Sequence, residues 1–229
     1  MLEELNNNYK ITDIQKQKNN PKRYSIFLDD SFAFGIDEID LLYYKLEINK
    51  TLSKKDYDFI INNLVLTKAK NKALKYLSYR MRAKSQVVEK LREQEEFSED
   101  IIEKVIVFLE KYNYVNDEIF CKAYINDKMN IKGYGSYKIS YDLKSLKIDD
   151  DLIDQFLYNS DLVDEQEQLK ILLQKKLQKN KYFNSTNIYN NSDTYYKEKQ
   201  KLFNFFARKG FSYDNINNAF VELIEEFRE

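Results

Sequence analysis

Cationic side chains gather in residues 67–95, where their number and spacing suit contact with a polymer of phosphates. Nine lysines and arginines stand there against three glutamates. Residues 132–147 hold four lysines against Asp142, and residues 195–209 hold five cations against Glu198. Several cations along one surface neutralise neighbouring phosphates and release their counterions, which is the chemistry of sequence-independent nucleic-acid binding. The three segments are therefore candidate anion-binding surfaces.

Ten side chains in these segments are predicted to make the contacts. They are Arg80, Arg82, Lys84, Lys90, Arg92, Lys132, Tyr134, Lys138, Lys144 and Arg208. Tyr134 and Tyr137 flank glycines in KGYGSYK, so their rings could stack on nucleic-acid bases. The same rings could instead pack at the start of a helix, and the sequence leaves both interpretations open.

Acidic residues are segregated from the basic ones. Residues 149–165 carry seven aspartates and glutamates and no lysine or arginine. In stacked helical units this pattern would give a basic stripe beside an acidic one, suited to an anionic polymer or its protein coat. The alternative is an ordinary solvated surface, because carboxylates favour the first turns of helices in any protein.

The residue types on which many enzymes depend are scarce. The sequence has no histidine, the commonest general base and metal ligand. Its one cysteine, Cys121, can form neither an internal disulfide nor a thiolate metal cage, and a small buried helix residue is expected there. Glycine-rich phosphate loops of the familiar kinds are missing. We therefore predict no catalytic residue, metal or cofactor, and a carboxylate-metal nuclease is the catalytic alternative.

The composition favours a mainly α protein. Of 229 residues 43% are hydrophobic and 33% charged, and only four glycines and one proline are present to form turns. The net charge is −1, so any affinity for nucleic acid must come from local clusters. Neither a signal-peptide core nor an apolar run of roughly 20 residues is found. A cytoplasmic protein without membrane contact is predicted.

Residues 1–66 are predicted to form a small α+β module. Runs rich in β-branched and aromatic residues indicate an antiparallel sheet over residues 9–36, with a tight turn at Asp29 and Asp30. Helical patterns follow, and Ser53 is placed to cap the second of these helices.

A helix-start signature occurs three times further along, as FSEDIIEKV, IDDDLIDQF and FSYDNINNA. Ser98, Asp149 and Ser212 stand at the N-cap positions. In each copy an apolar residue precedes the cap and another follows five positions later, as Phe97 and Ile102 do, which predicts a hydrophobic staple.

Each copy opens the third helix of a three-helix unit. We therefore predict units at residues 67–113, 114–160 and 161–229, with a loop inserted in the last unit at residues 180–194. Gly210 is placed as the C-cap of a helix in that unit. Stacking such units joins their cores, so an elongated and curved array is expected.

Two segments resemble the RecX family of bacterial regulatory proteins. Residues 73–91 contain ALKYL, the basic RMRAKS and VEKL, similar to the first repeat of that family. Residues 114–125 contain YVNDE followed by Phe120, Ala123 and Tyr124, which resembles the family's most recognisable segment. The N-terminal β-containing segment is also similar to that of longer family members.

The resemblance implies a function that composition alone does not. RecX-like proteins bind the filament of the RecA recombinase on single-stranded DNA, lie along its groove and modulate recombination and DNA repair, usually by inhibition. It implies a non-enzymatic regulator, expected to be a monomer, whose partners are the RecA filament and, through it, single-stranded DNA. The alternative is a sequence-nonspecific nucleic-acid-binding protein that acts without RecA.

Overall fold

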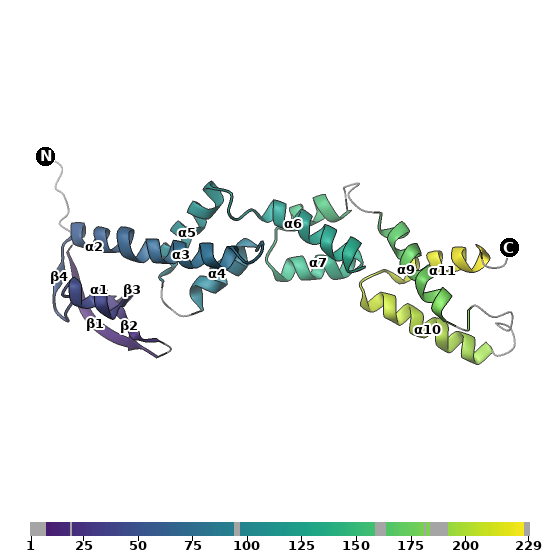
Figure 1. Ribbon diagram of the computed structural model, residues 1–229, viewed down its shortest axis with the longest axis horizontal. Coiled ribbons are helices and arrows are strands. Elements are labelled where there is room, and N and C mark those ends of the chain that lie inside the picture. Colours follow the sequence, from purple (N-terminus) through teal and green to yellow (C-terminus); the bar gives the residue numbers. More distant parts are fainter. Residues whose placement is uncertain are drawn as a thin grey trace. The chain divides into compact units, whose positions relative to one another are not determined.

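The computed structural model describes residues 8–18, 20–93, 97–158, 164–180, 182–183 and 192–226. Helices predominate and one small sheet lies near the N-terminus (Figure 1). The chain divides into two compact units, Met1–Asn116 and Asp117–Glu229. The mainly helical fold and the N-terminal antiparallel sheet that the sequence predicts are both confirmed.

The first unit begins with a four-stranded antiparallel sheet in the order β3-β2-β1-β4. The strands are β1 (Tyr9–Gln17), β2 (Asn20–Leu28), β3 (Ser31–Asp37) and β4 (Thr51–Leu52). The predicted turn between β2 and β3 is present. Asp29 and Asp30 have φ of 47° and 66°, as the two central residues of a type I′ hairpin turn require. The sequence did not predict β4, because a two-residue strand has no periodicity to detect.

A continuous helical run leads out of the sheet. After α1 (Glu38–Tyr43) and β4, α2 (Lys54–Ile60), the π-helical η1 (Ile61–Val65) and α3 (Leu66–Leu77) follow without a break (Figure 1). The Ser53 Oγ accepts a hydrogen bond from the Asp56 N–H at 3.2 Å, so the predicted cap is confirmed. The run crosses the position between residues 66 and 67 where the sequence suggested a boundary.

The first three-helix domain consists of α3, α4 (Lys84–Arg92) and α5 (Glu99–Lys111). Its buried side chains belong to the same core as the sheet, a cluster that extends from Ile11 to Val115. Phe97 and Ile102 both lie in this core, as the predicted staple requires. Ser98 is the N-cap of α5, as predicted, although its hydroxyl accepts no cap hydrogen bond.

The second three-helix domain opens the second unit. It consists of α6 (Asp117–Asn126) continued by η2 (Asp127–Ile131), then α7 (Ser136–Ser145), and α8 (Asp150–Ile153) continued by η3 (Asp154–Tyr158). The predicted cap at its third helix is confirmed, since Asp149 Oδ1 accepts a hydrogen bond from the Asp151 N–H at 2.8 Å.

The third three-helix domain consists of α9 (Glu165–Lys179), α10 (Ser192–Arg208) and α11 (Tyr213–Glu226). The Ser212 Oγ accepts from the Asn215 N–H at 3.0 Å, which confirms the third predicted cap. Gly210 has a φ of 95°, as expected for a glycine that ends a helix. Most of the predicted loop, residues 181 and 184–191, lies outside the described residues, and α10 already begins at Ser192.

The second and third domains meet through backbone hydrogen bonds at the start of α7. The Gly135 N–H donates to the Lys209 carbonyl at 2.9 Å, and the Tyr137 N–H donates to the Gly210 carbonyl at 3.1 Å. The first N–H groups of a helix have no partner within the helix. The turn between α10 and α11 therefore supplies acceptors that the N-terminus of α7 needs.

Candidate nucleic-acid interface

The loop between α3 and α4 carries one of the predicted contact residues that lie at the surface, Arg80. Arg80 is exposed, and its neighbours Tyr79 and Met81 are 74% and 51% exposed. Within the described part of the chain, no hydrogen bond or ion pair engages the Arg80 side chain. Lys75, one turn back on α3, is likewise exposed and has no carboxylate partner among the described residues. Both cations are available to an external anion.

Arg82, in the same loop, is half-buried and packs against the protein. Its guanidinium carbon lies 4.2 Å from the centre of the Tyr76 ring, a cation–π contact. Its Nε is buried and has no hydrogen-bond partner among the described residues. Lys90 Nζ lies 5.7 Å from the same ring. The structure therefore gives Arg82 a packing role that holds the loop against α3.

The other predicted cations of the first domain are ion-paired. Lys84 Nζ lies 3.0 Å from Glu110 Oε1, and Lys90 Nζ lies 2.5 Å from Glu93 Oε2. Arg92 binds Glu99 through two bonds of 2.7 and 2.5 Å. The Arg92 hydrogen bond holds the pKa of the Glu99 carboxyl below its usual value. These pairs reduce the surplus positive charge that the segment shows in the sequence.

A second group of predicted residues lies at the junction of the second and third domains. The Tyr134 ring centre is 5.6 Å from Lys138 Nζ and 5.5 Å from Lys209 Nζ. Lys209 Nζ donates to the carbonyls of Lys132 and Gly133, each at 3.0 Å. These contacts favour helix-start packing for Tyr134, whereas Tyr137 is 65% exposed.

Lys209 was not among the predicted contacts, although it lies in the basic run at residues 195–209. Burial, and secondarily the charge of Lys176, lowers the pKa of Lys209. Gly210 is the sequence signal that could have identified it, because the chain reverses there and brings the end of α10 to α7.

The remaining predicted residues of the second unit differ in how far they are neutralised. Lys138 and Lys144 pair with Asp142 and Asp150 at 3.3 and 3.0 Å. Lys132 is exposed, and no carboxylate engages it in the described ranges. Arg208, at the end of α10, is exposed, and its Nε donates to the Asn204 carbonyl at 3.1 Å.

Tyr124 also contacts Asp142, through a hydrogen bond of 3.3 Å from its hydroxyl. Burial, together with the charge of Asp142, raises the pKa of Tyr124 to about 12. Asp142 therefore joins α6 to α7 in addition to pairing with Lys138.

Cys121 is fully buried, as predicted. Burial, with a contribution from Asp117, raises the pKa of the Cys121 thiol to about 11, so the group is protonated at neutral pH and is a poor nucleophile. In the described segments, no group of three or more potential ligands is placed to hold a metal ion. None of the helices described is long and apolar enough to cross a membrane.

The chain is a multi-domain helical protein of a particular class. A small N-terminal α+β region is followed by three three-helix domains, which carry exposed basic side chains. Models of the RecX family match every part of this order. The N-terminal domain model of regulatory protein RecX matches residues 9–53, and the first, second and third three-helix domain models match residues 69–109, 116–157 and 164–220. The chain belongs to the RecX family.

Individual relatives agree with this assignment. The chain is 31% identical to the regulatory protein RecX of Clostridium botulinum (strain Eklund 17B / Type B), covering 94% of this chain and 96% of the relative. It is 33% identical to that of Bacillus subtilis (strain 168), covering 93% and 76%. The crystal structure of RecX from Lactobacillus salivarius is similar, with a TM-score of 0.56 and 29% identity, over 69% of this chain and 96% of that one.

Proposed function

We propose that this chain binds the filament that RecA forms on single-stranded DNA and lowers its recombinase activity in DNA repair and recombination. It acts in the cytoplasm as a monomer and catalyses no reaction itself. Membership of the RecX family, whose curated members are named regulatory proteins, supports the proposal. The RecA filament is proposed as the partner because residues 73–91 and 114–125 resemble the RecX family.

The observation that carries the proposal is the exposed loop between α3 and α4. Arg80 and Lys75 present positive charge that no described carboxylate neutralises, beside the exposed Tyr79 and Met81. An anionic filament surface can pair with these cations, and the neighbouring apolar groups can be buried against protein. We therefore propose Arg80 and Lys75 as the principal filament contacts of the first domain.

The test measures RecA-driven ATP hydrolysis on single-stranded DNA while this protein is titrated in, with RecA from the same organism. The expected result is a dose-dependent fall at substoichiometric ratios, because one bound regulator acts on several subunits of a filament. Unchanged hydrolysis together with binding to naked DNA would instead favour the nonspecific nucleic-acid-binding alternative. Such binding would weaken steeply with salt.

A further inference from the structure

A basic cavity lies between α9 and α10 of the third domain. Its volume is about 480 Å³, within the range of small-molecule sites. Six of the residues that line it are cationic or aromatic: Lys176, Lys179, Tyr182, Lys201, Phe205 and Arg208. Only Arg208 belongs to the contact set predicted from the sequence.

The cavity carries more positive charge than its own residues neutralise. It is lined by four cations and one carboxylate, Glu198. Glu198 is engaged by Lys201 at 2.7 Å and by the Asn180 amide at 3.3 Å. The cations Lys176, Lys179 and Arg208 have no carboxylate partner among the described residues. Most of the cations predicted as contacts in the first two domains, by contrast, are paired with a carboxylate.

One of these uncompensated charges, Lys176, lies close to a further cation, Lys209. Lys176 Nζ is 4.3 Å from the Phe205 ring centre and Lys209 Nζ is 5.7 Å from it. Like charges held near one another repel, so a bound anion would lower the energy of this arrangement. The lowered pKa of Lys209, caused by burial and then by Lys176, is consistent with a positive local potential.

Aromatic rings supply a second feature of the cavity. Tyr182 is 40% exposed and Phe205 is half-buried. Nucleic-acid bases stack on such rings irrespective of their identity. Clustered cations beside flat apolar rings are complementary to a nucleotide, in which phosphate and base are joined.

We propose that the cavity between α9 and α10 binds a nucleotide, with its phosphates at Lys176, Lys179 and Arg208 and its base against Tyr182 or Phe205. The ligand is either a free nucleoside triphosphate or one nucleotide of a single strand, since both present the same chemistry. The inference does not rest on the proposed regulation of RecA, because its test needs only this chain and its ligand.

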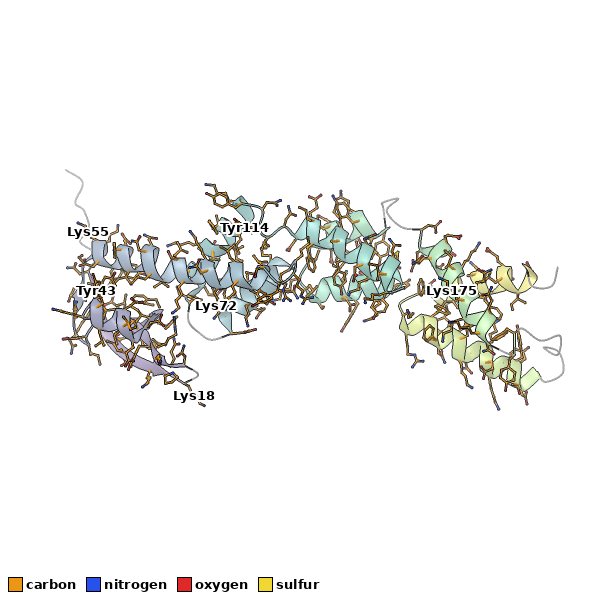
Figure 2. The ribbon with its side chains drawn as sticks, viewed as in Figure 1. Lys18, Tyr43, Lys55, Lys72, Tyr114 and Lys175 are labelled. Atoms are coloured by element: carbon orange, nitrogen blue, oxygen red, sulfur yellow. The ribbon has the colours of Figure 1, made fainter. Side chains whose placement is uncertain are left out.

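The experiment compares two variants of the full chain that lose the same charge from the same helices. The cavity variant is K176Q/R208Q. The control is K175Q/K197Q, in which both residues are exposed and neither lines the cavity. Lys175 is marked on α9 in Figure 2. Circular dichroism verifies that both variants are folded before binding is measured.

Binding is followed by fluorescence anisotropy with a fluorescent ATP derivative in one arm and a labelled oligothymidylate in the other. The expected result is about tenfold weaker binding by the cavity variant than by the control, as loss of charged hydrogen bonds implies. Selective loss in the ATP arm identifies a free nucleotide, and selective loss in the oligothymidylate arm identifies a strand. Equal losses in the two variants, or no binding of either probe to the unmodified chain, would overturn the proposal.

Discussion

The backbone of Gly210 lies so close to Gly135 that a side chain has no room at Gly135. A Cβ on Gly135 would come within 2.4 Å of the Gly210 carbonyl oxygen. A Cβ on Gly210 would come within 2.4 Å of the Lys138 backbone nitrogen, and the φ of 95° at Gly210 disfavours any other residue. The junction of the second and third domains depends on both glycines.

Replacing Gly135 with alanine should destabilise this junction. Backbone atoms would have to move apart, and overpacking of this kind typically costs about 1–3 kcal/mol. We expect a lower urea midpoint for G135A, measured by circular dichroism. Gln174→Ala is the control, because Gln174 is exposed on α9 and alanine favours helix. Equal midpoints for G135A and the unmodified chain would contradict the close contact.

The exposed loop of the first domain can be tested by charge reversal. In K75E/R80E, repulsion from an anionic filament should replace attraction, so about tenfold more protein should be needed for the same inhibition of RecA-driven ATP hydrolysis. The matched control is K54E/K55E, which reverses two charges at exposed residues of α2; Lys55 is marked in Figure 2. If K75E/R80E inhibits as well as the unmodified chain, the loop is not the contact.

Two serines at helix starts should respond differently to the same substitution. Ser53→Ala removes the hydrogen bond that the Ser53 Oγ accepts from the Asp56 N–H, and should lower the free energy of unfolding by about 1 kcal/mol. Ser98→Ala removes no cap bond and should have little effect. Urea unfolding of both variants provides the comparison, and a larger loss for S98A would refute the difference.

The ion-paired Asp37 should make the stability of the first unit depend on pH. Burial alone raises the pKa of Asp37, but the Lys68 hydrogen bond and the charges of Arg23 and Lys68 outweigh it, and the pKa lies below the usual 3.8. A lowered folded-state pKa stabilises the fold above the unfolded-state pKa, and this contribution is lost as the pH falls through the folded value.

Asp37→Asn should therefore be less stable than the unmodified chain at pH 7, and the difference should shrink as the pH falls below about 4. Urea midpoints measured at pH 7, 4 and 2.5 would follow the change. A difference that stays constant over this range would show that Asp37 does not stabilise the unit through its charge.

Local sequence signals predicted much of the fold. The turn at Asp29 and Asp30, the caps at Ser53, Asp149 and Ser212, and the helical periodicity all depend on residues close in sequence. Ser98 is also an N-cap but makes no side-chain cap bond, because an N-cap residue can adopt the right backbone without orienting its hydroxyl. The short β4 pairs with Tyr9 and Lys10, which are far away in the sequence, and no local pattern reveals this pairing.

The candidate site was harder to predict, because charge counts along a segment ignore partners from other helices. Glu110 lies 26 residues from Lys84 and neutralises it. The cations of the α9–α10 cavity come from two helices that a long intervening segment separates in the sequence. Only the folded chain shows which charges remain available.

The unbroken helix from α2 through α3 has a consequence for dissecting the protein. Its residues Val65 and Ala69 lie in one core with the sheet and with α5. A deletion ending at residue 66 would cut this helix and strip apolar partners from the first three-helix domain. The sheet and that domain should therefore melt in a single cooperative transition. Any loss of activity in a fragment that lacks the sheet would then reflect misfolding of the first three-helix domain, and not the missing contribution of the sheet.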